Sequence, residues 1–226
     1  HSNDAGVATG MSNGGRDESP VIGIDFDNTI ACYDRVFHAT AMRHGLIDAD
    51  TRMAKSPIRD AIRQHPDGEL HWQRLQAEVY GPLMPQAQLL EGVLAFLQRC
   101  RRNDFPVYVV SHKSEFARRD ETQTNLRHAA RSWMQERQLL DLDTTGLDAQ
   151  RVFFEGTRSD KVMRIRQLAC THFIDDLPEV LLAPDFPPQV TRILLSASAS
   201  ASAGSSLAAL HVAHNWDDVD RILFDA

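Results

Sequence analysis

The sequence predicts an α/β protein: a Rossmann-like, doubly wound parallel sheet with a small, mainly helical cap inserted after the first strand. Three observations support this fold class. Five short segments are apolar almost throughout, which is typical of parallel strands covered by helices on both faces. Segments with apolar residues at helical spacing alternate with these strands. One stretch, from about Ala31 to Pro85, interrupts the alternation and contains no clear strand.

The expected strands are short runs rich in β-branched and aromatic residues, and polar or turn-forming residues bound them. In a parallel sheet, the carboxyl ends of all strands meet at one edge, where open α/β sheets bind their ligands. The expected strands are residues 21–26, 107–110, 152–154, 172–174 and 192–195, with 211–213 as an additional edge strand.

Three apolar stripes predict helices that pack on the sheet through one face. Ser159 and Asp160 are candidate capping residues at the start of the third helix. The stripes are Leu89, Leu90, Val93, Leu94 and Leu97; Leu126, Ala129, Ala130, Trp133 and Met134; and Val162, Ile165, Leu168 and Ala169.

The predicted domain organisation follows from these elements. Residues 20–30 and 86–226 form the Rossmann-like core, and residues 31–85 form the cap. Residues 1–19 are rich in Gly, Asn, Ser and Asp and are predicted to be disordered. The alternating Ser-Ala tract at 196–206 is predicted to be a mobile surface loop.

Composition excludes several classes of function. The chain has 226 residues and a net charge of -7, which argues against a general nucleic-acid binder but not against a small phosphorylated substrate. Its three cysteines, Cys32, Cys100 and Cys170, form no CxxC pair, which argues against a disulfide framework or a zinc site. Free thiols, no membrane-spanning run and no signal-peptide core predict a cytoplasmic protein without a membrane partner. The oligomeric state stays open.

Reactive residues follow the predicted strands. Asp25 and Asp27 are two residues apart, so in extended chain their carboxylates share a face. Two carboxylates this close repel each other unless a cation or a shared proton lies between them. Aspartate is also a competent nucleophile toward phosphorus.

The other strand ends carry complementary groups. Ser111, His112 and Lys113 follow the second strand, Lys161 lies at the helix start after the third, and Asp175-Asp176 end the fourth. Together they bring carboxylates, a hydroxyl and lysine to one edge of the sheet. Oxygen-rich clusters favour a hard cation such as Mg²⁺.

These motifs resemble those of the haloacid dehalogenase (HAD) superfamily. The segment Asp25-Phe26-Asp27-Asn28-Thr29 resembles its DxDxT signature, and Val109-Val110-Ser111 resembles its second motif. Lys161 and Phe173-Ile174-Asp175-Asp176 resemble the third and fourth motifs, in family order. The resemblance spans about Val21 to Leu195 and implies that the cap is of the C1 type.

The resemblance implies a role for each motif residue. Asp25 is then the nucleophile, Asp27 the general acid and base, and Ser111 and Lys161 hold the phosphoryl oxygens. Mg²⁺ is then bound by Asp25, the backbone carbonyl of Asp27 and Asp176, with Asp175 nearby. Candidate substrate-binding residues are Asn28, Thr29, His112 and Lys113, with a surface role as the alternative for His112 and Lys113.

The resulting hypothesis is Mg²⁺-dependent hydrolysis of a small phosphomonoester through an aspartyl phosphate. Family members that cleave carbon–halogen or carbon–phosphorus bonds lack an aspartate at the position of Asp27, so this residue favours phosphate esters. Two alternatives stay open. One is a phosphotransferase or mutase that uses the same aspartyl phosphate, and the other is a non-catalytic module that binds a phosphorylated partner.

Overall fold

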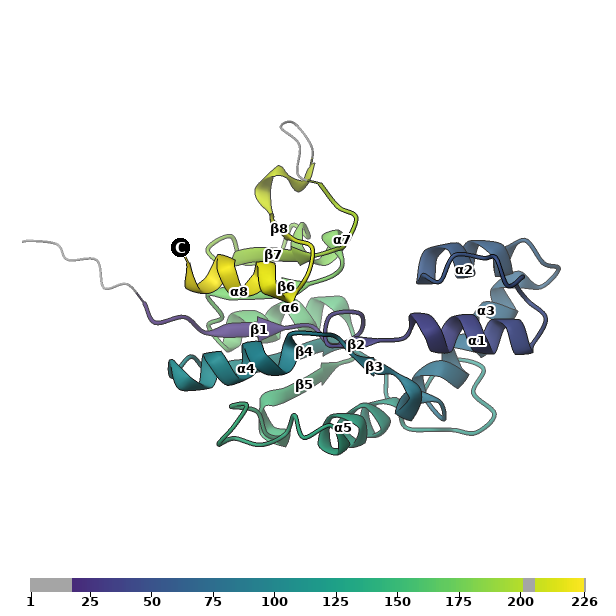
Figure 1. Cartoon of the computed structure of the whole chain (residues 1–226), viewed down its shortest axis with the longest axis horizontal. Helices are drawn as coiled ribbons and strands as arrows, with labels where there is room; N and C mark the ends of the chain where they lie inside the picture. The colour runs from purple at the N-terminus through teal and green to yellow at the C-terminus, as the bar shows by residue number, and fades with distance from the viewer. Residues whose placement is uncertain (1–17, 201–205, 226) are drawn as a thin grey trace, which may run out of the picture.

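The computed structural model describes residues 18–200 and 206–225. Within them, a six-stranded parallel sheet carries helices on both faces, and three further helices form an insertion beyond one edge of the sheet (Figure 1). The predicted α/β fold class is therefore confirmed. The predictions made for residues 1–17 and 201–205 fall outside the described part of the chain.

All six expected strands are present, including the edge strand. In order across the sheet they run β5-β4-β1-β6-β7-β8, and every neighbouring pair is parallel. The order reverses between β1 and β6, which is where doubly wound sheets bind ligands. The strands are β1 (Ile22–Ile24), β4 (Val107–His112), β5 (Val152–Glu155), β6 (His172–Asp175), β7 (Thr191–Leu195) and β8 (His211–Ala213).

The register of the central strands positions the acidic residues. Ile24 of β1 pairs with Val109 on one side and with Ile174 on the other. The backbone N–H of Asp25 donates to the carbonyl of Ile174 at 2.9 Å, so the β1–β6 ladder continues one residue past β1. Asp25 and Asp175 therefore leave the sheet at the same level.

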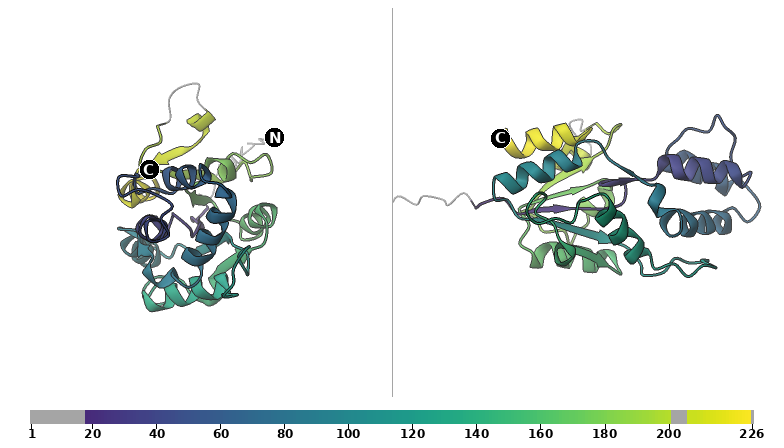
Figure 2. Two further views of the ribbon diagram at one scale, coloured as in Figure 1. Left: turned by 90° about the vertical axis from the view of Figure 1, so that its right-hand side faces the viewer. Right: turned by 60° about the horizontal axis from the view of Figure 1, so that its bottom comes forward.

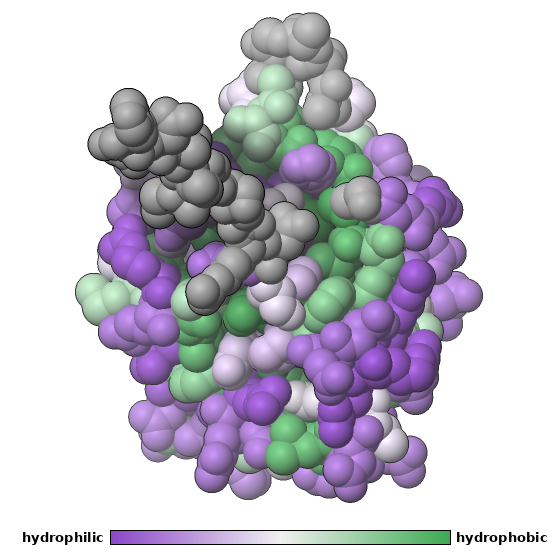
Figure 3. Space-filling model, turned by 90° about the vertical axis from the view of Figure 1, so that its left-hand side faces the viewer, coloured by the Kyte–Doolittle hydropathy of each residue, from purple (hydrophilic) through white to green (hydrophobic). Residues whose placement is uncertain are grey.

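Helices cover both faces of the sheet with separate apolar cores. One core includes residues of α4 (Val93–Arg102), α5 (Leu126–Glu136) and α8 (Trp216–Phe224). The other includes residues of α6 (Arg158–Gln167) and α7 (Pro178–Leu181). Figure 3 views the end of the molecule opposite the insertion and shows mainly hydrophilic residues at its rim, with hydrophobic ones nearer the middle.

The first apolar stripe was predicted as helical over too long a range. Leu89 lies in β3 (Gln88–Leu89), and Leu90 precedes α4, which begins at Val93. Leu94 was expected to face the core but is 38% exposed. The reason is that the chain leaves β3 through a turn at Gly92, whose φ is +92°, and apolar spacing alone does not reveal such a turn.

The N-cap residue of α6 also differs from the prediction. Thr157, not Ser159 or Asp160, is the N-cap, and its hydroxyl accepts a hydrogen bond from the Asp160 N–H at 3.0 Å. Ser159 and Asp160 instead occupy the first turn. Ala169 lies past the end of α6, exposed and with a φ of +53°, so it does not belong to the core-facing stripe.

The insertion consists of α1 (Asp34–Arg43), α2 (Lys55–Arg63) and α3 (Gly68–Tyr80), and it lies beyond the carboxyl ends of the strands (Figures 1 and 2). Its helices pack on one another through apolar side chains, including Phe37 stacked on Trp72 with ring centroids 5.2 Å apart, and these residues belong to the same apolar core as α4, α5 and α8. The prediction of no strand in this stretch was wrong, because β2 (Ala31–Cys32) pairs antiparallel with β3. Two residues are too few to show a strand periodicity.

The β2–β3 pair joins both ends of the insertion to the core. A short 3-10 helix, η1 (Met84–Gln86), precedes β3 and completes the connection. The paired strands tie the first and last residues of the insertion together. The insertion is thus held beside the carboxyl edge of the sheet at a defined point.

The cysteines are free thiols, as expected. Cys100 and Cys170 are buried, and Cys32 is half-buried. Burial raises the pKa of the Cys100 and Cys170 thiols to about 12, so both stay protonated and unreactive. Across residues 18–200 and 206–225, none of the helices combines the length and apolar character needed to cross a membrane.

Candidate active site

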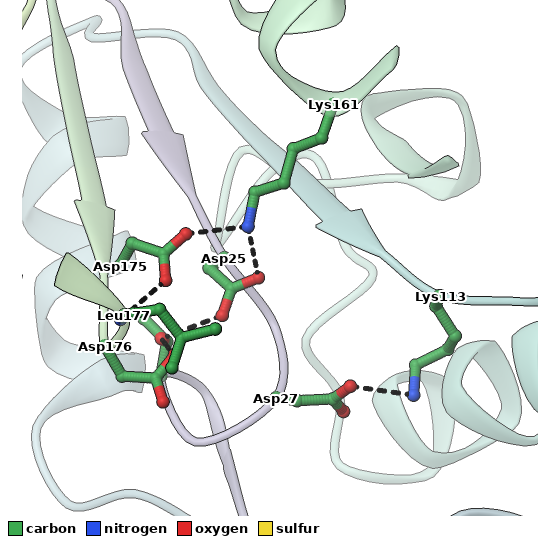
Figure 4. A network of polar contacts seen from close by, with 8 residues as sticks. Asp25, Asp27, Lys113, Lys161, Asp175, Asp176 and Leu177 are labelled. Atoms are coloured by element: carbon green, nitrogen blue, oxygen red, sulfur yellow. Dashed lines mark hydrogen bonds and ion pairs between the residues drawn. The ribbon is translucent and has the colours of Figure 1, made fainter. Parts of the chain in front are cut away.

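Three carboxylates and one lysine gather at the floor of a pocket at the carboxyl edge of the sheet, with Asp175 directly behind the pocket surface (Figure 4). The ammonium of Lys161 lies 2.8 Å from Oδ1 of Asp25 and 2.7 Å from Oδ2 of Asp175. Asp25, Asp175 and Asp176 each offer an oxygen within 4.8 Å of the others. The structure thus brings together four of the residues that the motifs singled out.

Local structure explains why these groups meet. Asp25 directly follows β1, and Asp175 is the last residue of the neighbouring strand β6. Lys161 comes from the first turn of α6, where its backbone N–H donates to the carbonyl of the N-cap Thr157 at 3.1 Å. The N–H of Leu177 donates to Oδ1 of Asp175 at 2.9 Å and leaves its other oxygen for Lys161.

Thr29 supports the floor from behind. Its hydroxyl lies 3.2 Å from Oδ2 of Asp25 and 3.4 Å from Oδ1 of Asp176. Its carbonyl accepts a hydrogen bond from the Trp216 indole N–H at 2.9 Å. Thr29 is fully buried and does not line the pocket, so it orients Asp25, whereas it was expected to bind substrate.

The acidic floor carries more negative charge than one lysine balances. Burial and the nearby Asp25 raise the pKa of Asp175 to about 6, although Lys161 opposes the shift. Partial burial, Asp25 and Asp175 raise the pKa of Asp176 to about 9. Burial alone would lower the pKa of Lys161, but Asp25 and Asp175 raise it well above its usual range.

A divalent cation fits this arrangement. The cluster is made only of carboxylate oxygens, which are the ligands that hard ions such as Mg²⁺ prefer. Burial and the neighbouring carboxylates raise the pKa values of Asp175 and Asp176, and a bound cation would oppose both effects.

Asp27 lies apart from this cluster and is held from two sides. The phenol of Tyr33 donates a hydrogen bond to Oδ1 of Asp27, and the ammonium of Lys113 lies 3.0 Å from Oδ2. Burial and the Asp27 charge raise the pKa of Tyr33 well above its usual range, so the phenol keeps its proton and donates. The expected contact between the Asp27 backbone carbonyl and a metal stays a prediction.

Lys113 is a buried partner of Asp27. It is 4% exposed, and its ammonium lies 5.0 Å from the centre of the Tyr80 ring and 5.7 Å from that of Phe26. It does not line the pocket. The structure therefore places it in neither of the two roles expected for it, substrate contact or free surface.

The pocket has a volume of about 680 Å³ and lies between the strand ends and the insertion. Seven of the predicted site residues form part of its wall, and Thr29, Lys113 and Asp175 lie behind the wall. The seven are Asp25, Asp27, Asn28, Ser111, His112, Lys161 and Asp176.

Three of these wall residues have distinct settings. Asn28 has a φ of +61° in the tight turn after Asp27, a conformation that asparagine tolerates, and its N–H donates to the Ala31 carbonyl at 2.7 Å. Ser111 is buried in β4, in register with Phe154 of β5. His112 is exposed, with a ring nitrogen 3.1 Å from the Gly156 carbonyl.

The motif analysis missed several residues of the site. Tyr33 and Tyr80 lie around Asp27 and Lys113, and their rings contact each other edge-on with centroids 4.9 Å apart. No local sequence pattern marks either tyrosine. The pocket wall also includes cations that no motif covers, namely Arg52, Lys55, Arg59 and Arg158.

Comparisons with known proteins agree at the level of fold. No protein-family model matches the sequence, and no curated protein matches it. Solved structures do match. Protein Tyrosine Kinase A of Mycobacterium tuberculosis has a TM-score of 0.59 at 14% identity, covering 92% of this chain and 99% of that one.

Two further structures give the same result. A putative haloacid dehalogenase-like hydrolase from Bacteroides fragilis has a TM-score of 0.56 at 16% identity, with coverage of 89% and 100%. A HAD family hydrolase from Deinococcus radiodurans, with bound phosphate and sodium, has a TM-score of 0.55 at 14% identity, with coverage of 92% and 96%. The chain therefore shares its fold with these structures, in agreement with the α/β fold that the motifs' resemblance implied.

Proposed function

We propose that the protein is a Mg²⁺-dependent phosphohydrolase that cleaves small phosphomonoesters through an aspartyl phosphate on Asp25. One observation carries the proposal. Asp25 lies at the pocket floor, bridged by Lys161 to Asp175, while a second carboxylate, Asp27, lines the same pocket two residues further on. A nucleophile and a separate proton carrier are what ester cleavage at phosphorus requires.

The residues that would hold the metal are Asp25, Asp175 and Asp176, whose oxygens lie within 4.8 Å of one another. When bound, Mg²⁺ supplies positive charge that neutralises the cluster and the phosphoryl oxygens. Lys161 adds a fixed positive charge beside Asp25. With this charge in place, the carboxylate of Asp25 can approach a phosphate dianion.

The first step transfers the phosphoryl group to the protein. A carboxylate oxygen of Asp25 forms a bond to phosphorus while the bond from phosphorus to the alcohol oxygen breaks. Asp27, carrying a proton, delivers it to that oxygen, so the alcohol leaves neutral. Ser111 and Lys161, both at the pocket wall, hold the phosphoryl oxygens.

The second step regenerates the enzyme. Asp27, now ionised, takes a proton from water as the water oxygen bonds to phosphorus. The phosphorus bond to Asp25 breaks and inorganic phosphate is released. Tyr33 and Lys113 hold the Asp27 carboxylate in place for both proton transfers.

The helical insertion shapes the pocket. Wall residues come from α2, from α3 and from the segment before α2, as well as from the core. An insertion in this position limits the access of water and of large substrates. We therefore treat residues 31–85 as a cap that selects a small metabolite.

Phosphoryl transfer to another acceptor is the second candidate. The likeness in fold to a protein described as a tyrosine kinase is the observation that favours it. The same aspartyl phosphate serves both reactions, which differ only in whether water or another nucleophile attacks it. A purely non-catalytic phosphate-binding module has no need for both Asp25 and Asp27.

The test is a panel of phosphate esters incubated with the purified protein and Mg²⁺, with phosphate release as the readout. We expect release by the wild type and none by Asp25→Asn. Added alcohols, sugars and tyrosine-containing peptides report transfer products by mass spectrometry. Halide release from a haloacid, with no phosphate release from any ester, would contradict the proposal.

A further inference from the structure

The pocket has a cationic side in addition to its acidic floor. Arg52, Lys55 and Arg59 come from α2 and the turn before it, and Arg158 is the first residue of α6. We call these four residues the basic rim. None of them belongs to the machinery assigned to the phosphoryl group, which is Lys161, Ser111 and the metal-binding carboxylates.

The geometry of α2 directs the rim into the pocket. Lys55 and Arg59 are four residues apart on this helix and share one face. Residues Ala54, Lys55 and Ser56, at the start of α2, also line the pocket, and no side chain caps this end of the helix. The positive end of the helix dipole thus adds to the charge of the side chains.

The distribution of lysine is a second, independent observation. The chain has 21 arginines but only three lysines, Lys55, Lys113 and Lys161. Lys113 binds Asp27, Lys161 bridges Asp25 and Asp175, and Lys55 lines the same pocket. Every lysine is therefore at this site, while arginine supplies the basic residues elsewhere.

Lys55 stays charged in its setting. Its ammonium lies 5.8 Å from the centre of the Tyr80 ring, on which Lys113 also lies at 5.0 Å. Burial alone would lower the pKa of Lys55, but Tyr80, Asp27 and Asp176 raise it. Lys55 is hydrogen-bonded to Tyr80, and among residues 18–200 and 206–225 it has no salt bridge within 4.0 Å, so its charge at the wall of the open pocket is available to an anionic ligand.

With a cation bound, the positive and negative charges of the floor cancel, whereas the rim has more positive than negative charge. With a divalent cation bound, the three floor carboxylates and Asp27 are matched by that cation, Lys161 and Lys113. The rim has four cations and one carboxylate at the pocket wall, Asp34, and Arg59 also contacts Asp60 at 3.1 Å. Even with Arg59 assigned to Asp60, the rim keeps a net positive charge at the pocket wall.

We propose that the basic rim is a second anion subsite, and that the substrate is a phosphomonoester whose alcohol portion carries a further acidic group. This inference rests on the proposed phosphohydrolase function. The recognised group is a carboxylate or a second phosphate, because arginine and lysine pair with both. The buried floor takes the phosphoryl group to be cleaved, and the rim takes the other anion.

Kinetics on matched esters test the subsite. 3-Phosphoglycerate and glycerol 3-phosphate share a carbon skeleton and differ in a carboxylate against a hydroxymethyl group. Fructose 1,6-bisphosphate and fructose 6-phosphate form the corresponding pair for a second phosphate. We expect kcat/KM to favour the acidic member of at least one pair by about tenfold or more, because the rim adds charge-assisted hydrogen bonds to the second acidic group.

Substitutions in the basic rim test whether the rim causes the preference for the acidic esters. Lys55→Met and Arg158→Gln should each reduce the preference about tenfold, chiefly through KM, since the subsite binds substrate and does not react. Lys55 is on the insertion and Arg158 on the core, so a folding defect in one variant leaves the other informative. Arg102→Gln is the matched control, because Arg102 is exposed near the end of α4 and is not at the pocket wall.

A labelling experiment gives a readout without turnover. Lys113 and Lys161 are 4% and 2% exposed, so Lys55 is the lysine most open to acylation. In Asp25→Asn with Mg²⁺, we expect 3-phosphoglycerate or fructose 1,6-bisphosphate to slow acetylation of Lys55, as followed by peptide mass spectrometry. Glycerol 3-phosphate should protect it less.

The outcomes separate the two proposals. Hydrolysis of none of the esters overturns the phosphohydrolase function on which the subsite rests. Hydrolysis with no preference for the acidic members, or a preference that survives in both rim variants, overturns the subsite and leaves the phosphohydrolase function standing. A preference within the first pair alone assigns the rim to a carboxylate, and within the second alone to a phosphate.

Discussion

Replacing Lys161 with methionine tests the electrostatic account of the site floor. Methionine is of similar length, is apolar and suits a helix, so the packing and the first turn of α6 should survive. The variant loses the ammonium that lies 2.8 Å from Asp25 and 2.7 Å from Asp175. These side chains are almost completely buried, so water cannot replace the lost charge.

The expected loss of stability follows from this burial. Removing one partner of a buried ion pair costs roughly 3–5 kcal/mol, out of a total stability of roughly 5–15 kcal/mol. Protonation of one carboxyl removes the unpaired charge, so the cost of adding that proton limits the loss of stability to a similar value. Placing a proton at pH 7 on a carboxyl whose ordinary pKa is 3.8 costs about 4 kcal/mol. For a chain of this length, the loss corresponds to a fall in Tm of roughly 6–20 °C.

The penalty should depend on pH in a defined direction. Without Lys161, the folded protein holds a proton on the Asp25–Asp175 pair. In the unfolded chain, the carboxyl releases this proton at any pH above the ordinary pKa of aspartate. Stability then falls as pH rises, by about 1.4 kcal/mol per pH unit for one proton. The wild type also loses stability as pH rises, because the folded pKa values of Asp175 and Asp176 are about 6 and about 9. The difference between the two proteins should nevertheless shrink between pH 7 and pH 5.

Urea unfolding of both proteins at pH 5, 6 and 7, with EDTA present, measures this difference. Mg²⁺ should reduce the penalty, because the cation replaces the missing charge. The double variant Lys161→Met with Asp175→Asn should be more stable at pH 7 than Lys161→Met alone, because one buried carboxylate is gone. A penalty below about 1 kcal/mol at pH 7, or one that is equal at pH 5 and pH 7, would refute the reasoning.

Three further outcomes are expected. Asp25→Asn should abolish turnover and keep the fold, because the amide lacks the nucleophilic oxygen and the metal charge; a phosphorylated mutant protein in the mass spectrum would show that the nucleophile lies elsewhere. EDTA should abolish activity, Mg²⁺ should restore it and Ca²⁺ should restore little, since Ca²⁺ takes more ligands in looser geometry; full activity in EDTA would contradict the metal site. Asp27→Asn should slow phosphorylation by alkyl phosphates about 10²–10⁴-fold and by p-nitrophenyl phosphate far less, because the phenolate leaves without a proton. If rapid-quench experiments showed that the phosphorylation rate falls equally for both esters, Asp27 would not be the general acid.

The fold could be predicted because its signals are local. Each core strand is an apolar run with punctuating residues, and all six appear where expected. The alternation with amphipathic helices then leaves few arrangements other than a parallel, doubly wound sheet. Errors occurred where local signals are weak, as at Leu89 and Leu90, where a two-residue strand and a glycine turn interrupt an apolar stripe, and at the N-cap of α6.

The floor of the site could be predicted for the same reason. Asp25, Asp175 and Asp176 follow strands, and Lys161 follows a strand across a short loop. Parallel strands all end at the same edge, so residues far apart in sequence gather there by topology alone. The motif order was sufficient to infer that these groups meet, and the distances of 2.7 and 2.8 Å around Lys161 agree with that inference.

The surroundings of Asp27 and the basic rim depended on tertiary structure. Tyr33, Lys113 and Tyr80 surround Asp27 only because the insertion packs against the core. The basic rim forms only because α2 and the turn before it line the same pocket as Arg158 of the core. The sequence by itself determined the sheet, the strand-end motifs and their chemistry, because hydrophobic periodicity and chain direction are local properties. Only the tertiary structure decided which insertion residues face those motifs, because that depends on how the insertion packs against the core in one shared apolar cluster, and no periodicity in the chain encodes it.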